Sequence, residues 1–123
     1  MTIKEVSEKY NVPPATLRYY EKEGLIPHVS RSSGGIRDYG DSDLRWLELV
    51  ICMRRAGLDI EAVREYRRLY EEGDETIKDR IMLLKKECEK LKERLADTAS
   101  MLSRLDYKIS KYEEALATGH LKW

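Results

Sequence analysis

The sequence predicts a mainly α protein in which a winged helix-turn-helix domain precedes a long coiled-coil helix. Three observations predict it: two short helix patterns separated by a turn, a Ser/Gly-rich hairpin signal after them, and a heptad repeat near the end of the chain. The composition agrees, because 37% of the 123 residues are charged, 8% are aromatic and none is Phe. Such a composition is typical of solvated helices rather than of a β-sandwich or a barrel.

The start of the chain predicts two short helices. Thr2 and Glu5 have the spacing of a capping box, and apolar residues then recur on one helical face. We expect this helix to stop at Asn11, because asparagine tolerates the left-handed conformation of a tight turn. Two prolines come next and suit a helix start, so a second helix is expected from residue 15 to about 23, closed by Gly24. Two short helices joined in this way are the layout of a helix-turn-helix.

Residues 30–39 combine a Ser/Gly-rich turn with short flanks that include apolar residues, a pattern that predicts a two-stranded wing. Asp41 or Ser42 is expected to cap a third helix, which is interrupted at Gly57. A fourth helix is expected to begin at Asp59 and to end at the next glycine.

The remainder of the chain has the pattern of one long helix. Residues 74–117 contain no Gly or Pro, and apolar residues recur at alternating spacings of four and three for more than five heptads. A lone helix would leave this stripe in water, so it needs a partner, most simply a second copy of the chain. We therefore expect a DNA-binding domain over residues 1–72 and a coiled-coil dimerisation helix with a short tail over 73–123. The stripe consists of Ile77, Ile81, Leu84, Cys88, Leu91, Leu95, Thr98, Leu102, Leu105, Ile109, Tyr112 and Leu116.

Composition and motif content exclude several classes of protein. The net charge is zero, so DNA contact would depend on where basic groups lie rather than on their excess. No apolar run approaches the roughly 18 residues of a membrane span, and no apolar signal core opens the chain, so we expect a cytoplasmic protein. Two distant thiols and one tail histidine do not make a tetrahedral site, so neither a metal nor another cofactor is expected. His28 and His120 lie in no catalytic motif, so we do not expect an enzyme.

Two motifs resemble those of the MerR family of transcription regulators. The segment from Val12 to Ile26, Val-Pro-Pro-Ala-Thr-Leu-Arg-Tyr-Tyr-Glu-Lys-Glu-Gly-Leu-Ile, closely resembles the recognition-helix motif of that family. The Gly-Ile-Arg-Asp-Tyr sequence at 35–39 resembles the family's Gly-x-Arg-x-Tyr wing. Together with the helices around them, the motifs cover residues 2 to about 72, and the coiled coil also fits. Asn11 departs from the Gly of many relatives but suits the same turn.

The resemblance implies a regulator that binds double-stranded promoter DNA as a homodimer joined by an antiparallel coiled coil. Many members bend and untwist a promoter so that RNA polymerase can use it. A purely structural coiled-coil adaptor would explain the stripe but not the recognition helix and wing.

The residues support this implied function independently. Arg18 can pair with a phosphate or read a guanine, and hydroxyl groups suit phosphate oxygens. Core packing is the alternative role for the two tyrosines of the helix, most of all for Tyr20, and a solvated charge pair is the alternative for Arg54 and Arg55. The expected DNA-binding residues are Thr16, Arg18, Tyr19, Tyr20, Arg31, Arg37, Tyr39, Arg54 and Arg55.

Cys52 is the candidate effector-sensing residue. Arg55 lies one helical turn later and can stabilise a thiolate. The neighbourhood is similar to that of the aldehyde- and electrophile-responsive MerR regulators, which implies a stress-responsive switch driven by modification of this thiol. The alternative is that Cys52 is a small core residue, in which case the regulator would respond to a metabolite or a partner protein. Cys88 lies on the heptad stripe, where packing is the expected role.

Overall fold

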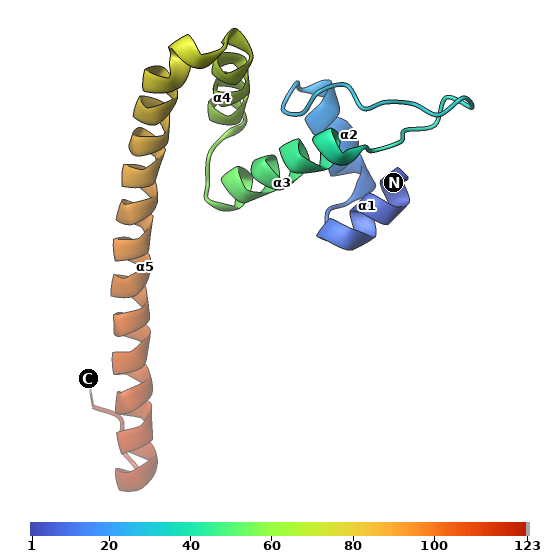
Figure 1. Cartoon of the computed structure of the whole chain (residues 1–123). Helices are drawn as coiled ribbons and strands as arrows, with labels where there is room; N and C mark the ends of the chain where they lie inside the picture. The colour runs from blue at the N-terminus through green and yellow to red at the C-terminus, as the bar shows by residue number, and fades with distance from the viewer. Residues whose placement is uncertain (123) are drawn as a thin grey trace. The chain divides into compact units, whose positions relative to one another are not determined.

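The computed structural model describes residues 1–122. Over this part of the chain it contains helices and connecting loops and no multi-residue strand (Figure 1). Contacts divide the chain into one compact unit from Met1 to Leu84 and a second that begins at Lys85. The elements are α1 (Ile3–Tyr10), α2 (Pro14–Lys22), α3 (Asp41–Arg55), α4 (Ile60–Glu72), the short 3-10 helix η1 (Asp74–Thr76) and α5 (Ile77–Thr118).

The helix-turn-helix forms as its local signals predict. The hydroxyl of Thr2 accepts a hydrogen bond from the backbone N–H of Glu5, and the Glu5 carboxylate accepts one from the N–H of Thr2. These bonds hold the pKa of Glu5 below its ordinary value. Asn11 has φ 54° and Gly24 has φ +75°, so both predicted left-handed helix ends are confirmed. Helix α2 begins at Pro14, one residue before the expected start, because proline already has a helical φ and needs no partner for an N–H.

The predicted two-stranded wing is wrong in detail. Residues 30–39 form a hairpin loop with a single antiparallel bridge, between Arg31 and Arg37, and no strands on either side of it. The N–H of Ser32 donates to the carbonyl of Ile36 at 2.7 Å and closes the turn. The flanks are short, and apart from the half-buried Arg37 and the buried Tyr39 their residues are exposed, so they bury too little apolar surface to extend the ladder. We keep the name wing for this loop, residues 30–39.

The start of α3 also differs from the expectation. Gly40, rather than Asp41 or Ser42, occupies the capping position, and Asp41 is the first helical residue. The carboxylate of the buried Asp43 reaches back and accepts a hydrogen bond from the N–H of Gly40 at 2.9 Å. An acidic side chain in the first turn therefore satisfies the backbone that a capping side chain would otherwise have satisfied.

The first unit has one hydrophobic core. Helix α1 packs against α2, and α3 packs against α4. Trp46 meets the rings of Tyr66 and Tyr70 edge to face, with centroids 6.5 and 5.0 Å away. The buried core residues are Val6, Val12, Leu17, Tyr20, Leu25, Ile26, Val29, Tyr39, Leu47, Val50, Ile51, Met53, Leu58 and Val63.

Polar contacts join the start of α5 to α4, so the first unit extends beyond residue 72. The hydroxyl of the buried Thr76 donates to the carbonyl of Leu69. The guanidinium of Arg80 donates to the carbonyl of Gly73 at 2.8 Å and lies 5.4 Å from the ring centre of Tyr70. These contacts keep the first two turns of α5 in the compact unit that contains α1 to α4.

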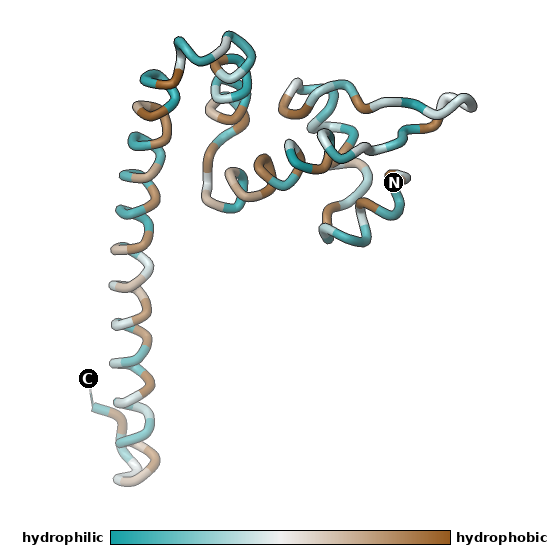
Figure 2. The backbone as a smooth tube through the Cα atoms, viewed as in Figure 1, coloured by the Kyte–Doolittle hydropathy of each residue, from teal (hydrophilic) through white to brown (hydrophobic). Residues whose placement is uncertain are grey.

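Helix α5 is continuous over 42 residues, about 63 Å at the rise of an α-helix. None of its residues is buried in the chain. Apolar residues recur along one side of it, as the brown segments of α5 in Figure 2 show. The predicted stripe is therefore present and exposed, with Leu102 at 60% and Leu116 at 88% of full exposure. No helix among the described residues is long and apolar enough to cross a membrane.

Candidate nucleic-acid interface

Helix α2 buries one side and presents the other to solvent. Leu17 is fully buried, as its position between polar residues predicts. Exposed residues recur at spacings of three and four, which places them on a single face of the helix. This exposed face of α2 consists of Ala15, Arg18, Tyr19 and Lys22. It offers two cations and a tyrosine that is 44% exposed, a set of groups suited to phosphate oxygens and base edges.

Two of the expected contact residues are buried instead. Tyr20 is 8% exposed and belongs to the core, the alternative that sequence analysis left open for it. Tyr39 is 2% exposed, and its hydroxyl has no hydrogen-bond partner among the described residues. Burial raises the pKa of this hydroxyl. Both rings therefore belong to the core of the first unit, and the hydroxyl of Tyr39 is not accessible to a ligand in this conformation.

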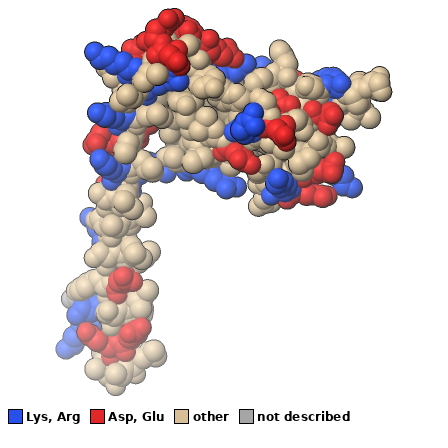
Figure 3. Space-filling model, viewed as in Figure 1, with Lys and Arg blue, Asp and Glu red and all other residues tan. Residues whose placement is uncertain are grey.

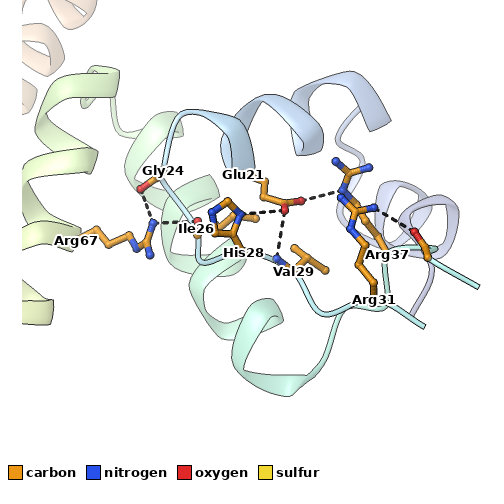
Figure 4. Close-up of polar contacts among 9 residues, drawn as sticks. Glu21, Gly24, Ile26, His28, Val29, Arg31, Arg37 and Arg67 are labelled. Carbon is orange, nitrogen blue, oxygen red and sulfur yellow. Dashed lines mark hydrogen bonds and ion pairs between the residues drawn. The ribbon is translucent and has the colours of Figure 1, made fainter. Parts of the chain in front are cut away.

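Glu21 is a buried carboxylate that joins α2 to both ends of the wing. It accepts a hydrogen bond from Arg37 Nε at 2.8 Å and one from the N–H of Val29 at 3.4 Å, and His28 Nδ1 lies 3.5 Å away. Figure 4 shows these three groups converging on it. Burial raises the pKa of Glu21, but the bonds from Arg37, His28 and Val29 outweigh this effect, so the pKa lies below its ordinary value.

The two wing arginines differ in what they can offer a ligand. The side chain of Arg37 is 22% exposed and bonded to Glu21. Arg31 is exposed, and its guanidinium donates to the carbonyl of Gly35 within the same hairpin at 3.3 Å. Arg31 thus presents a cation at the wing, whereas Arg37 chiefly sets the position of the wing.

Residues of α2 and α3 meet around a shallow hollow of about 290 Å³. Thr16 contributes from α2, and Arg54 and Arg55 contribute from the end of α3. The guanidinium of Arg54 donates to the carbonyl of Leu58 at 2.8 Å, which caps the end of the helix, while both arginines remain exposed. Tyr20 of α2 also lines the hollow, so the structure brings together four of the expected contact residues from two separate elements.

Cys52 is exposed, so the single chain does not bury it as a core residue. It borders a hollow of about 330 Å³ between α1 and α3, with Tyr10, Glu48, Ile51 and Arg55. The hydroxyl of Tyr10 donates to Glu48 Oε1 at 2.6 Å, and this bond raises the pKa of Tyr10 to about 12. The thiol thus lies beside a hydrogen bond that joins α1 to α3.

Three residues of this region were not singled out from the sequence. Lys22 lies four residues after Arg18, so helical spacing alone could have placed it on the same face. Glu21 carries no local signal, because its main partner is sixteen residues away. Arg67 is similar: it donates to the carbonyls of Gly24 and Ile26 at 2.7 and 3.0 Å and ties α4 to the loop that follows α2 (Figure 4).

Charge is distributed unevenly over the first unit. Acidic side chains gather over the turn between α4 and α5 at the top of Figure 3, where Glu71, Glu72, Asp74 and Glu75 are exposed. The exposed face of α2 and the tip of the wing carry cations instead. Among the described residues no group of His, Cys, Asp or Glu is placed to hold a metal ion. The fold and this surface define a helix-turn-helix DNA-binding protein.

Comparison with protein families makes the class more specific. Residues 1–69 match the family model described as MerR HTH family regulatory protein, and residues 44–107 match the model described as MerR, DNA binding. The chain belongs to the MerR family of transcriptional regulators, which bind promoter DNA. Its relatives are named as transcriptional regulators, in agreement with the prediction that it is not an enzyme.

Individual relatives support this assignment over most of the chain. The transcriptional regulator AdhR of Bacillus subtilis is 48% identical over 91 residues, which are 74% of this chain and 65% of AdhR. A MerR family regulator from Listeria monocytogenes has a solved structure that is 45% identical, with a TM-score of 0.86, over 97% of this chain and 90% of that one. HiNmlR, solved bound to promoter DNA and described as lacking the sensor domain, is 34% identical with a TM-score of 0.84, over 96% and 94% of the two chains.

Proposed function

We propose that two copies of the chain bind one promoter duplex and insert their α2 helices into successive major grooves. The exposed face of α2, with Arg18 at its centre, is the observation that carries this proposal. A recognition helix in the major groove is the usual docking of a helix-turn-helix, and a dimer matches a two-fold symmetric operator. The relative HiNmlR was solved bound to promoter DNA, which supports promoter DNA as the partner.

The roles of the individual residues follow from their exposure. Arg18 is suited to a guanine or a phosphate, and Tyr19, Thr16 and Lys22 are suited to phosphates that fix the register. Arg31 on the wing, with Arg54 and Arg55 at the end of α3, would extend the backbone contact. We propose that Arg37 holds the wing in place through Glu21. Tyr20 and Tyr39 pack in the core of the first unit.

The proposed dimer forms through α5. Its apolar stripe is exposed along the whole helix, and burial against a second copy would remove that surface from water. We take the pairing to be antiparallel, as the family resemblance implies.

We further propose that the bound dimer acts by distorting the promoter, which RNA polymerase then uses. Bending and untwisting DNA costs a few kcal/mol, so a small change in the geometry of the dimer is enough to change transcription. Because promoter DNA and RNA polymerase are the proposed partners, we propose that the protein acts in the cytoplasm.

Cys52 is the residue that we propose as the sensor. Its thiol can add across the C=O bond of a reactive aldehyde and form a hemithioacetal, a step that needs no oxidant. The added group would occupy the hollow between α1 and α3 and press on the Tyr10–Glu48 hydrogen bond.

The alternative is a regulator of the same fold that responds to a metabolite or a partner protein, with Cys52 in a structural role. Exposure of the Cys52 thiol favours the sensor role over the structural role, because a packing role would require burial.

A mobility-shift assay on the promoter region next to the protein's own gene tests DNA binding. We expect a specific complex whose affinity falls steeply as salt increases, because phosphate contacts release counterions. Equal affinity for a scrambled duplex of the same length would contradict the proposal.

A further inference from the structure

The apolar stripe of α5 is flanked on one side by charges whose sign changes along the helix. This flanking row consists of the residues that directly follow every second residue of the stripe. In the first half of the helix the row is basic, and in the second half it is acidic. Its charged members are Lys78, Lys85, Lys92, Asp106 and Glu113. The opposite flank carries Arg80, Glu87 and Arg94 in the first half and Lys108 in the second.

We propose that three kinds of opposite-charge pair fix a single antiparallel register between the α5 helices of two copies. The pairs are Lys78 with the partner's Glu113, Lys85 with the partner's Asp106, and Glu87 with the partner's Lys108. Each pair occurs twice because the dimer is two-fold symmetric. Flanking positions of this kind set the orientation and the partner of a coiled coil.

In this register each stripe residue faces a different stripe residue of the partner. Ile77 faces the partner's Leu116, Leu84 faces the partner's Ile109, and Leu95 faces the partner's Thr98. The two small or polar members of the stripe, Cys88 and Thr98, therefore each face a leucine of the partner, and neither faces its own copy, which favours even packing between the two stripes. The flanking rows then bring no two like charges together.

The parallel arrangement fits the same helix less well. It would place Cys88 on the partner's Cys88 and Thr98 on the partner's Thr98, which pairs the weakest packing residues with themselves. It would also bring Arg80 beside the partner's Lys85, and like charges at such positions are destabilising. It would form two kinds of favourable pair, Glu87 with the partner's Lys92 and Lys108 with the partner's Glu113, against three in the antiparallel register. The sequence of α5 therefore favours the antiparallel pairing on its own, without reference to relatives.

The surface of the second unit agrees with a second copy as occupant. An apolar hollow of about 670 Å³ lies along the end of α5 beside Leu105, Ile109 and Tyr112, with Lys108 and Glu113 at its edges. The proposed register brings the partner's first turns of α5 to this hollow, with the partner's Glu87 and Lys78 opposite those two charges.

Some charges on α5 are already paired within the helix, including Glu87 of the opposite flank, which pairs with Lys90 at 3.2 Å. Glu89 pairs with Lys92 at 3.1 Å, and Lys111 pairs with Glu114 at 3.5 Å. Among the described residues Lys85 and Asp106 have no ion-pair partner in their own chain.

This inference rests on the proposed homodimer and adds its register. Disulfide cross-linking in the full chain tests it, in a background that carries Cys52→Ala and Cys88→Ala. One subunit carries Leu84→Cys and is mixed with a subunit that carries Ile109→Cys. A mild added oxidant, copper phenanthroline with oxygen, takes two electrons and two protons from the facing thiols. Matched mixtures replace Ile109→Cys with Leu102→Cys or Leu116→Cys, each one heptad away.

We expect the mixture with Ile109→Cys to give about tenfold more cross-linked dimer than either matched mixture. A slip of one heptad moves a residue about 10 Å, beyond the reach of a disulfide. Dominant cross-linking of Leu84→Cys with itself would show a parallel coil, and dominant cross-linking with either matched variant would show a slipped register. Both results would overturn the inference.

Charge reversal gives a second test. The double variant Lys78→Glu with Lys85→Glu should dissociate at least about tenfold more readily at low salt, as should Asp106→Lys with Glu113→Lys. An equimolar mixture of the two should form a heterodimer that recovers the original stability. The control, Lys86→Glu with Arg104→Glu, reverses two exposed charges that do not flank the stripe.

The outcomes separate this inference from the proposal on which it rests. If the unaltered chain sediments as a monomer, the proposed dimer fails. If it sediments as a dimer but the first charge-reversed variant is unaffected or more stable, the dimer stands and the register is wrong.

Discussion

Arg37 Nε donates to Glu21 Oε1 at 2.8 Å, and this contact joins the wing to the recognition helix α2. The two residues lie sixteen positions apart, and the carboxylate is almost fully buried. Glu21 also accepts from the N–H of Val29 near the other end of the wing. The angle between wing and recognition helix therefore depends on one acidic side chain.

Replacing Glu21 with Gln should destabilise the chain, because the buried partner of Arg37 would lose its charge. We expect a loss of about 1–3 kcal/mol in the free energy of unfolding. Urea denaturation followed by circular dichroism measures it, with the exposed Glu8→Gln as a matched control. An equal midpoint for both variants would show that the contact contributes no stability.

The contribution of Glu21 should also depend on pH. Its pKa is lower in the folded chain than the ordinary value of 4.5, so the unfolded state takes up a proton first as pH falls. The stabilisation is therefore complete above the unfolded-state pKa and is lost as pH falls through the folded-state pKa. The difference in unfolding free energy between the unaltered chain and Glu21→Gln should shrink from about pH 7 to about pH 3. A difference that grows with acidity would contradict the assignment.

Arg18→Ala should weaken specific DNA binding, because Arg18 lies at the centre of the exposed face of α2. We expect a loss of about 1–3 kcal/mol, roughly a tenfold to hundredfold rise in Kd, measured by fluorescence anisotropy on a promoter duplex. Arg68→Ala is the control, since Arg68 is an exposed arginine on α4 that pairs with Glu65 and Glu72. Comparable losses in the two variants would mean that only net charge matters.

Cys52→Ala should abolish induction by formaldehyde or methylglyoxal in a reporter strain while leaving DNA binding in place. The reason is that, of the two exposed thiols, Cys52 borders the hollow between α1 and α3, where the added group would press on the Tyr10–Glu48 hydrogen bond. Cys88→Ala serves as the control for the other thiol. If Cys52→Ala is still induced, the sensor role of Cys52 is wrong, and the alternative of a regulator that responds to a metabolite or a partner protein is favoured.

Tyr10 should ionise above the ordinary tyrosine pKa of 10.0, because its hydroxyl donates to Glu48. Its raised pKa of about 12 implies that this bond adds stability below the ordinary pKa of 10.0, and that the added stability is lost as pH rises through about 12. The absorbance of tyrosinate near 295 nm, compared between the unaltered chain and Tyr10→Phe, isolates this titration. A difference curve with a midpoint near 10 would contradict the hydrogen bond.

Local signals in the sequence were enough to predict the two helices of the helix-turn-helix. The capping box of Thr2 and Glu5, the left-handed Asn11 and the terminating Gly24 each depend on residues close to one another along the chain. The heptad stripe of α5 was equally readable, because its period depends on helical geometry alone.

Tertiary contacts explain what the sequence did not predict. The sequence alone does not show that Tyr39 is buried in the core or that Glu21 accepts a hydrogen bond from Arg37. Both contacts depend on how the wing packs against α2. The wing was expected to contain strands from its composition, yet its flanks form a single bridge. Exposure of Cys52 likewise depends on how α1 packs beside α3.

The central claim is that two chains, joined through α5, occupy one promoter duplex. Native mass spectrometry of the full chain with a two-fold symmetric promoter duplex measures this directly. We predict one dominant complex that contains two chains and one duplex, and no complex with a single chain when the duplex is in excess. A dominant complex of one chain with one duplex would contradict the account.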